Sequence, residues 1–221
     1  MYILIPSQTQ STRVPLKNIR PFFKNDSLLS IKLKQLLKVF PSEKIYVSSE
    51  DERVKKITEE FGCNYIPRPM SLTGNNILQG DLIGNMLSHL PKDSEDIMWV
   101  QVTQPLFDCF DEIIKCWNEK KKEGFDGLVA VKTVRHHIVS EKGIPINFNF
   151  GCWHKVSQKL PKCYEILWSA FVQTRESIET TKYQISKNPY YMPFDNIQTV
   201  DIDTIEDFNL ASKLYSEQVK L

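Results

Sequence analysis

The chain has 221 residues, of which 41% are hydrophobic and 25% charged, so it is long enough for one large α/β domain of ordinary globular composition. Its 28 Lys and Arg residues almost balance its 27 Asp and Glu residues, which argues against nucleic acid or an anionic membrane as the main partner. We expect no signal peptide and no membrane span, because no apolar run approaches about 20 residues. Five scattered cysteines predict free thiols and a cytoplasmic location.

Short apolar runs and helical patterns alternate along most of the chain. The apolar runs predict strands at residues 1–6, 45–47, 64–66, 97–100 and 128–131. Apolar residues at helical spacing predict helices near residues 27–40, 54–61, 77–90, 108–117 and 204–214. This alternation predicts a sheet with helices on both faces.

Several of these helices carry terminal signals. Ser27 precedes the first helix as an N-cap, and Gly62 follows the second where a C-cap glycine belongs. Asp108 or Asp111 is expected to begin the fourth helix. The pair of Thr204 and Asp207 predicts a capping box at the start of the last one.

Residues 132–167 break the alternation. They are rich in aromatic residues, Gly and Pro, and they contain no long periodic stretch. We interpret them as an inserted arm of short strands and loops. Because the chain has no internal repeat, residues 1–221 are expected to form a single domain that carries this arm.

A polar loop follows the first predicted strand and carries two spaced cations, Arg13 and Lys17. A first strand that leads into such a loop is typical of α/β proteins that bind a nucleoside triphosphate. The alternative is a surface loop whose polar residues have no ligand.

Two carboxylates, Asp201 and Asp203, lie two residues apart just before the last predicted helix. One or two carboxylates, completed by phosphate oxygens and water, are the usual protein ligands of Mg²⁺. The alternative is that they serve only as helix caps. We favour a metal site because of the loop at the other end of the chain.

The first loop resembles that of the N-acylneuraminate cytidylyltransferase family, which makes CMP-activated sugars. Its pattern, I-P-A-R-x-x-S-K-x-x-P-x-K-N, is matched here by Ser11, Pro15, Lys17 and Asn18. This chain has Gln8 where the family has its Arg, and Thr12 where a Lys is usual, so two cations that hold the triphosphate are replaced. Arg13 is the candidate substitute.

Two further segments carry the same resemblance. Residues 100–106 resemble L-Q-P-T-S-P-L, in which the glutamine lies beside the reacting sugar, and residues 200–207 resemble the family's S-I-D-I-D-T-x-x-D.

Arg68 precedes Pro69 as in the family and is the candidate contact to the cytosine side; the alternative is a solvent-facing loop arginine. In the arm, His136 and His137 resemble a His-His pair of bacterial sialic acid synthetases.

One stretch of the arm departs from the family. Residues 164–168 stand where relatives have Arg-Pro-Asn-Gly, and that arginine would suit the carboxylate of an ulosonic acid. The sugar acid therefore remains open between sialic acid and other ulosonic acids.

The resemblance implies a three-layer α/β/α nucleotide-diphospho-sugar transferase fold, Rossmann-like, and a homodimer in which the arm reaches the partner. It implies transfer of CMP from CTP to a sugar acid, with release of pyrophosphate. It implies catalytic roles for Lys17, Arg13, Gln101 and Asp203, nucleotide contacts from Ser7, Gln8, Ser11, Asn18, Arg68 and Thr103, and Mg²⁺ on Asp201 and Asp203.

Two other readings stay open. The replaced cations favour a catalytically weak or inactive member of the fold that acts as a binding partner in surface-polysaccharide synthesis. A glycosyltransferase that uses Asp201 and Asp203 fits less well, because its metal motif should lie in the middle of the chain.

Overall fold

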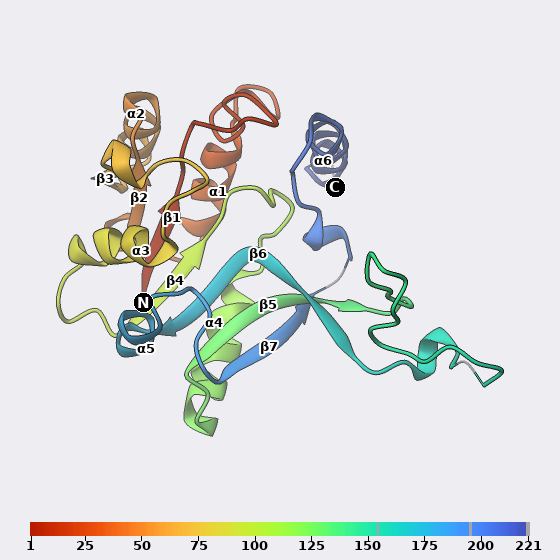
Figure 1. Ribbon diagram of the computed structural model, residues 1–221. Coiled ribbons are helices and arrows are strands. Elements are labelled where there is room, and N and C mark those ends of the chain that lie inside the picture. Colours follow the sequence, from red (N-terminus) through yellow and green to blue (C-terminus); the bar gives the residue numbers. More distant parts are fainter. Residues whose placement is uncertain (154, 195, 220–221) are drawn as a thin grey trace.

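The computed structural model describes residues 1–153, 155–194 and 196–219. Within this part of the chain, seven strands form one sheet in the order β3-β2-β1-β4-β6-β5-β7 (Figure 1). The strands are β1 Tyr2–Pro6, β2 Ile45–Ser49, β3 Asn64–Pro67, β4 Asp96–Val100, β5 Gly127–Val134, β6 Cys163–Thr174 and β7 Pro189–Phe194. The helices are α1 Leu28–Leu36, α2 Glu52–Glu60, α3 Gln79–Ser88, α4 Phe110–Lys120, α5 Arg175–Thr181 and α6 Ile205–Gln218.

The sheet separates two hydrophobic cores, because neighbouring residues of a strand point to opposite faces. In β1, Ile3 and Ile5 pack into a core that includes buried residues of α1, α2, α4 and α6, whereas Leu4 packs into a core that includes those of α3 and α5. The predicted three-layer α/β/α fold is therefore confirmed.

The predicted helix ends agree with the structure at three places. The Ser27 hydroxyl accepts a hydrogen bond from the Ser30 N–H at 3.1 Å, and Thr204 forms the full capping box with Asp207. Gly62 has a φ of +67°, which only glycine adopts without strain. The predicted start of α4 at Asp108 or Asp111 was wrong. The N-cap is Cys109, which makes no side-chain capping hydrogen bond, and Asp111 lies inside the first turn.

Strand β6 was not predicted, although it is the longest strand described. It runs antiparallel between β4 and β5, pairing Val100 with Ala170 and Val131 with Ile166. β5 and β6 continue together as a ribbon as far as Val134 and Cys163. The described residues between those two positions extend away from the body of the domain and include one 3-10 turn, Ser157–Lys159; residue 154, within the predicted arm, lies outside the described part (Figure 1).

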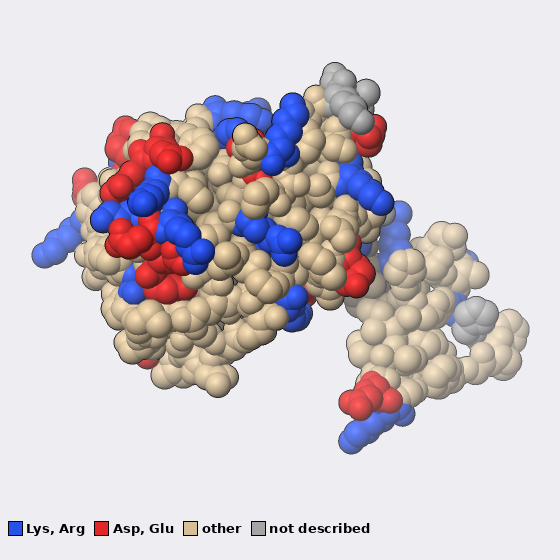
Figure 2. All heavy atoms as spheres, turned by 90° about the horizontal axis from the view of Figure 1, so that it is seen from above, with Lys and Arg blue, Asp and Glu red and all other residues tan. Residues whose placement is uncertain are grey.

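The surface has no extended face of one charge sign on the side seen in Figure 2, where acidic and basic side chains mix over the body. Among the described residues, no helix has both the length and the apolar character that crossing a membrane requires.

Candidate functional site

A cavity of about 290 Å³ lies at the carboxyl ends of β1 and β4. We call it the switch-point cavity, because β1 pairs in parallel with β2 on one side and with β4 on the other. Ligands of open α/β sheets bind at this kind of crevice. Eight of the residues expected to bind nucleotide or to act in catalysis line it: Gln8, Ser11, Arg13, Lys17, Asn18, Arg68, Gln101 and Thr103.

The loop after β1 is anchored by Val14, whose side chain is fully buried in the hydrophobic core. Beyond it, Leu16 has a φ of +54°, and its carbonyl accepts hydrogen bonds from the Ile19 and Arg20 N–H groups at 2.9 Å each. Asn18 joins this turn to the rest of the loop, because its amide donates to the Gln8 carbonyl at 3.1 Å. The loop therefore has a defined shape around the cavity.

Gln8 connects this loop to a second one. Its side-chain oxygen accepts a hydrogen bond from the Gly74 N–H at 3.0 Å, in the loop between β3 and α3. Gly74 has a φ of +100° and lines the same cavity with Asn75. Because a backbone N–H can only donate, this contact fixes the orientation of the Gln8 amide.

The acidic segment before α6 is held by the loop after β1 and by the residues that follow β4. Arg13 pairs with Asp203 at 2.7 Å, and the Lys17 ammonium donates to the Ile202 carbonyl at 2.5 Å. From the other side, the Ile202 N–H donates to the Thr103 carbonyl at 3.1 Å. Residues from both ends of the chain and from its middle therefore meet at one place.

Burial raises the pKa of Asp201 above its usual value, and the neighbouring Asp203 carboxylate raises it further. Hydrogen bonds from the Thr103 side chain and the Ile202 N–H act against this shift. Burial also lowers the pKa of Lys17, while the two carboxylates partly restore it. Asp201 and Asp203 are thus two interacting carboxylates, and a nearby positive charge would relieve their mutual repulsion.

Arg68 is buried rather than solvent-facing, with 6% of its surface exposed. Its guanidinium donates to the Ser48 carbonyl at 2.8 Å and to the Ser48 hydroxyl at 3.3 Å. Burial lowers its pKa, and no carboxylate of the described residues forms an ion pair with it. It is a desolvated cation at the wall of the cavity.

Three predicted site residues do not line the cavity. Ser7 is fully buried, its N–H donates to the Ser48 carbonyl at 2.9 Å, and its hydroxyl has no partner among the described residues. Asp201 and Asp203 lie beside the cavity and contact its lining through Thr103 and Arg13. No group of three or more His, Cys, Asp or Glu residues within the described ranges has metal-ligand geometry.

Other lining residues were not anticipated from the sequence. They include Trp99, whose buried ring N–H has no partner in the described part of the chain, and Gly74, Asn75 and Gln79. The Gly-Asn-Asn run that follows Arg68 by a few residues was the available signal, because such runs mark tight loops.

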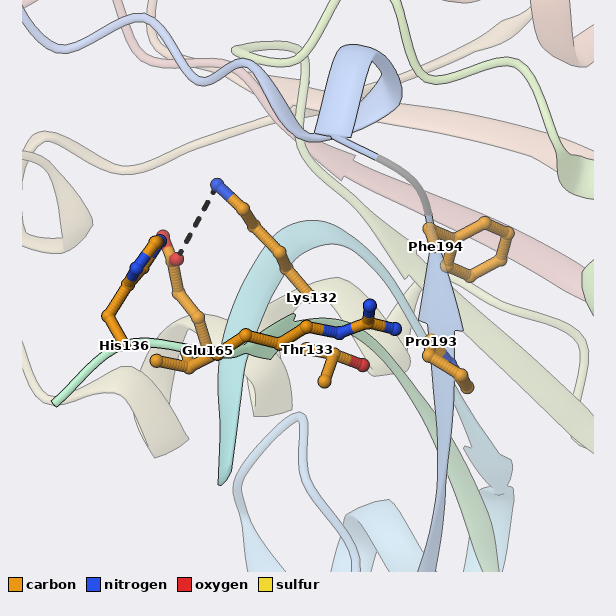
Figure 3. A pocket seen from close by; sticks show the side chains of 8 residues that line it. Lys132, Thr133, His136, Glu165, Pro193 and Phe194 are labelled. Atoms are coloured by element: carbon orange, nitrogen blue, oxygen red, sulfur yellow. Dashed lines mark ion pairs between the residues drawn. The ribbon is translucent and has the colours of Figure 1, made fainter. Parts of the chain in front are cut away.

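A second cavity, of about 730 Å³, lies where the β5–β6 ribbon leaves the body. We call it the ribbon cavity (Figure 3). Lys132 and Glu165 face each other there across the two strands at 4.0 Å, with His136 beside them. Arg135, which directly follows β5, and Phe194 from β7 also line it, and the described lining residues carry more basic than acidic side chains.

The chain is similar to known proteins both in sequence and in fold. The family model described as Cytidylyltransferase matches residues 2–109, which include the first loop, Arg68 and Thr103. The chain is 26% identical over 146 residues to 3-deoxy-manno-octulosonate cytidylyltransferase 2 of Hydrogenovibrio crunogenus (strain DSM 25203 / XCL-2). That match covers 65% of this chain and 56% of the relative, so the chain spans little more than half of the relative's length.

Two solved structures have the same fold over nearly the whole chain. One is a CMP:2-keto-3-deoxy-manno-octonic acid synthetase complexed with CTP, with a TM-score of 0.65, 13% identity and 98% of each chain covered. The other is the 4-diphosphocytidyl-2C-methyl-D-erythritolsynthase of Anaerococcus prevotii DSM 20548, with a TM-score of 0.68, 12% identity and 97% and 96% covered. Residues 2–109 are thus similar in sequence to cytidylyltransferases, and the chain shares the fold of these two structures.

Proposed function

We propose that this protein transfers CMP from CTP to a sugar acid and releases pyrophosphate. The observation that carries the proposal is the meeting of the first loop, the end of β4 and the acidic segment around one cavity at the switch point. The cytidylyltransferase family model supports it, because its match includes two of these three segments.

In the proposed reaction, the anomeric hydroxyl oxygen of the sugar acid forms a bond to the α-phosphorus of CTP. The bond from that phosphorus to the bridging oxygen of pyrophosphate breaks, and the hydroxyl proton leaves to solvent. Lys17 and Arg13 stabilise charge on the departing pyrophosphate, because they are the cations of the first loop. Gln8, Ser11 and Asn18 orient the nucleotide, with Arg68 and Thr103 at the cavity wall and Gln101 beside the acceptor.

The residues present fit a magnesium ion. Asp201 and Asp203 would hold it, since they are adjacent carboxylates and Asp201 is held by its contact with Thr103. When bound, Mg²⁺ polarises the phosphate and makes the attacking hydroxyl more acidic. Its arrival would compete with Arg13 for Asp203 and would leave that guanidinium available to phosphate.

The ribbon cavity supports an acidic acceptor. Lys132 and Arg135 bring basic side chains to it and His136 adds a hydrogen-bonding ring, whereas Glu165 is the one carboxylate among the described residues of its lining. A sugar acid suits this lining better than a neutral sugar does, because its carboxylate is attracted to the cations. Both sialic acid and 3-deoxy-manno-octulosonate belong to this class of acceptor.

The described part of the chain from residue 135 to residue 162 supports a homodimer. Six of its apolar side chains are about half exposed or more: Val139, Ile144, Ile146, Phe150, Trp153 and Val156. Trp153 is 92% exposed, and apolar groups of this size are normally covered by a partner. Sedimentation velocity should report a dimer, and changing both Phe150 and Trp153 to Asp should yield a monomer; a wild-type monomer would contradict this assignment.

The catalytically weak or inactive partner is the second candidate, and one observation favours it. The Arg13 guanidinium is engaged by Asp203, and Gln8 is neutral, so the first loop offers fewer free cations to a triphosphate than the family pattern does. This protein would then bind nucleotide without turnover.

Two measurements separate the candidates. Thermal unfolding with CTP and Mg²⁺, against UTP, ATP and GTP, should give a CTP-selective, Mg²⁺-dependent rise in Tm; a ligand at a hundredfold over its Kd adds about 2.7 kcal/mol. Pyrophosphate release should then require N-acetylneuraminate, 3-deoxy-manno-octulosonate or a related acid. A Tm shift without pyrophosphate release favours the inactive partner, and no shift with any nucleotide overturns the nucleotide site.

A further inference from the structure

Lys32 is a fully buried lysine in α1, with no exposed surface. Its ammonium donates hydrogen bonds to the Gln104 carbonyl at 3.0 Å and to the Phe107 carbonyl at 2.7 Å. It also lies over the rings of Phe107 and Phe110, at 5.9 and 5.1 Å from their centroids. Within the described ranges it has no carboxylate at ion-pair distance.

The segment that Lys32 holds is the connection from β4 to α4. Gln104, Leu106 and Phe107 are at most 2% exposed, so their carbonyls cannot turn to water. One turn further along α1, the Gln35 side chain donates to the Pro105 carbonyl at 2.7 Å. Donors from α1 therefore hold three carbonyls of a buried loop.

This loop begins next to the residues of the switch-point cavity. Thr103 directly precedes Gln104, its carbonyl accepts the Ile202 N–H at 3.1 Å, and its side chain hydrogen-bonds Asp201. A displacement of residues 104–107 would therefore move Thr103 and, through it, the acidic segment.

We propose that Lys32 is a positioning residue for the switch-point cavity: its ammonium fixes the Gln104–Phe107 loop and thereby the place of Thr103 and Asp201. The effect on CTP binding rests on the proposed function, whereas the chain of contacts from Lys32 to Thr103 and Asp201 does not depend on it. Burying a charge without a carboxylate is costly, and the hydrogen bonds to the two buried carbonyls offset part of that cost. The burial that lowers the pKa of Lys32 to about 7 reflects this cost.

The test compares Lys32→Met with Ile31→Val, its fully buried neighbour in the apolar core. Lys32→Met should lower the Tm, because it leaves the Gln104 and Phe107 carbonyls without their donor, and it should weaken CTP binding with Mg²⁺ about tenfold in calorimetry. It should also accelerate hydrogen exchange of the Ile202 amide at least tenfold. Ile31→Val should lower the Tm and leave both other measurements unchanged.

If Lys32 only supported the fold, Ile31→Val and Lys32→Met would differ in Tm alone; a loss of CTP binding and of Ile202 protection that Ile31→Val does not reproduce points to positioning. Wild-type exchange at Ile202 together with wild-type CTP binding in Lys32→Met would overturn the proposal. If Lys32→Met does not fold, Lys32→Gln, which keeps one donor, should show the same changes at reduced size, and wild-type values there would equally overturn it. If the wild type binds no CTP, the proposed function fails, and the exchange rate at Ile202 still decides the role of Lys32.

Discussion

The side-chain oxygen of Gln8 accepts a hydrogen bond from the N–H of Gly74 at 3.0 Å, and this contact joins two loops that line one cavity. At the position where the cytidylyltransferase pattern places a cation, this chain has a neutral side chain that fastens a loop. The remaining amide group of Gln8 is left as a neutral donor for a ligand.

Gln8→Arg should bind CTP about fivefold more tightly than the wild type. The guanidinium adds a charge-assisted contact to phosphate, whereas the lost bond to Gly74 is a neutral one, and the difference is roughly 1 kcal/mol. Calorimetry measures the Kd, and hydrogen exchange should show a less protected Gly74 amide. Gln8→Met is the matched control, since it removes both the acceptor and the donor and should weaken binding.

Asp203→Asn should abolish the dependence of CTP binding on Mg²⁺ and lower the rate of pyrophosphate release by about 10²–10³-fold. The reason is the loss of one of the two carboxylates proposed to hold Mg²⁺. Without Mg²⁺, the same variant should bind CTP at least as well as the wild type, because Arg13 loses its carboxylate partner. Glu206→Gln removes the same charge from the exposed first turn of α6 and should leave Mg²⁺ dependence intact; equal effects of the two changes would mean that only net charge matters.

Arg68→Met should weaken CTP binding by tenfold or more while leaving the Tm unchanged or higher. The guanidinium is buried without an ion-pair partner in the described residues, so it costs the fold free energy and gains most when an anion or carbonyl of the ligand arrives. Arg53→Met provides the comparison, because Arg53 is exposed on α2 and pairs with Asp51 at 2.6 Å. If both variants bind CTP like the wild type, Arg68 does not contact the nucleotide.

The stability of the wild type should depend on Lys32 in a defined pH range. Its folded-state pKa is lowered to about 7 from 10.5, so between these values the unfolded chain binds a proton that the folded chain does not. The free energy of unfolding is therefore highest above pH 10.5, the pKa of the unfolded chain. It falls as the pH falls toward 7, by roughly 1 kcal/mol per pH unit. Urea unfolding at several pH values should show the free energy of unfolding of the wild type rising relative to that of Lys32→Met between pH 7 and pH 10; a constant difference would contradict the lowered pKa.

Much of the fold follows from local patterns. The Ser27 cap, the apolar run of β4 and the box of Thr204 with Asp207 are local signals, and each appears where the pattern predicts it. Strand order is not local, and β6 was missed because its outer half, near Tyr164 and Glu165, has the mixed composition of a loop. Its inner half, which is buried between β4 and β5, gives no sequence signal for an antiparallel position.

The site was predicted less completely than the fold. Motif spacing identified the residues of the first loop and Gln101, because they lie directly after predicted strands. Lys32 gave no signal, since a lysine in a helix is normally solvated, and only the tertiary packing of α1 under the β4–α4 loop buries it. The contact between Gln8 and Gly74 likewise depends on two loops that are far apart in the sequence.

The pairing of Thr133 with Tyr164 and of Val134 with Cys163 brings together the two points at which the chain leaves and rejoins the ribbon. Whatever lies between them is an excursion that begins and ends at one place, so its length and composition are mechanically independent of the sheet. The excursion can therefore be exchanged as a unit: a two-residue Asn-Gly turn could close the ribbon, and a different excursion could be grafted there to change what the protein contacts, including the lining from Arg135 and His136, while the sheet and the switch-point cavity are retained.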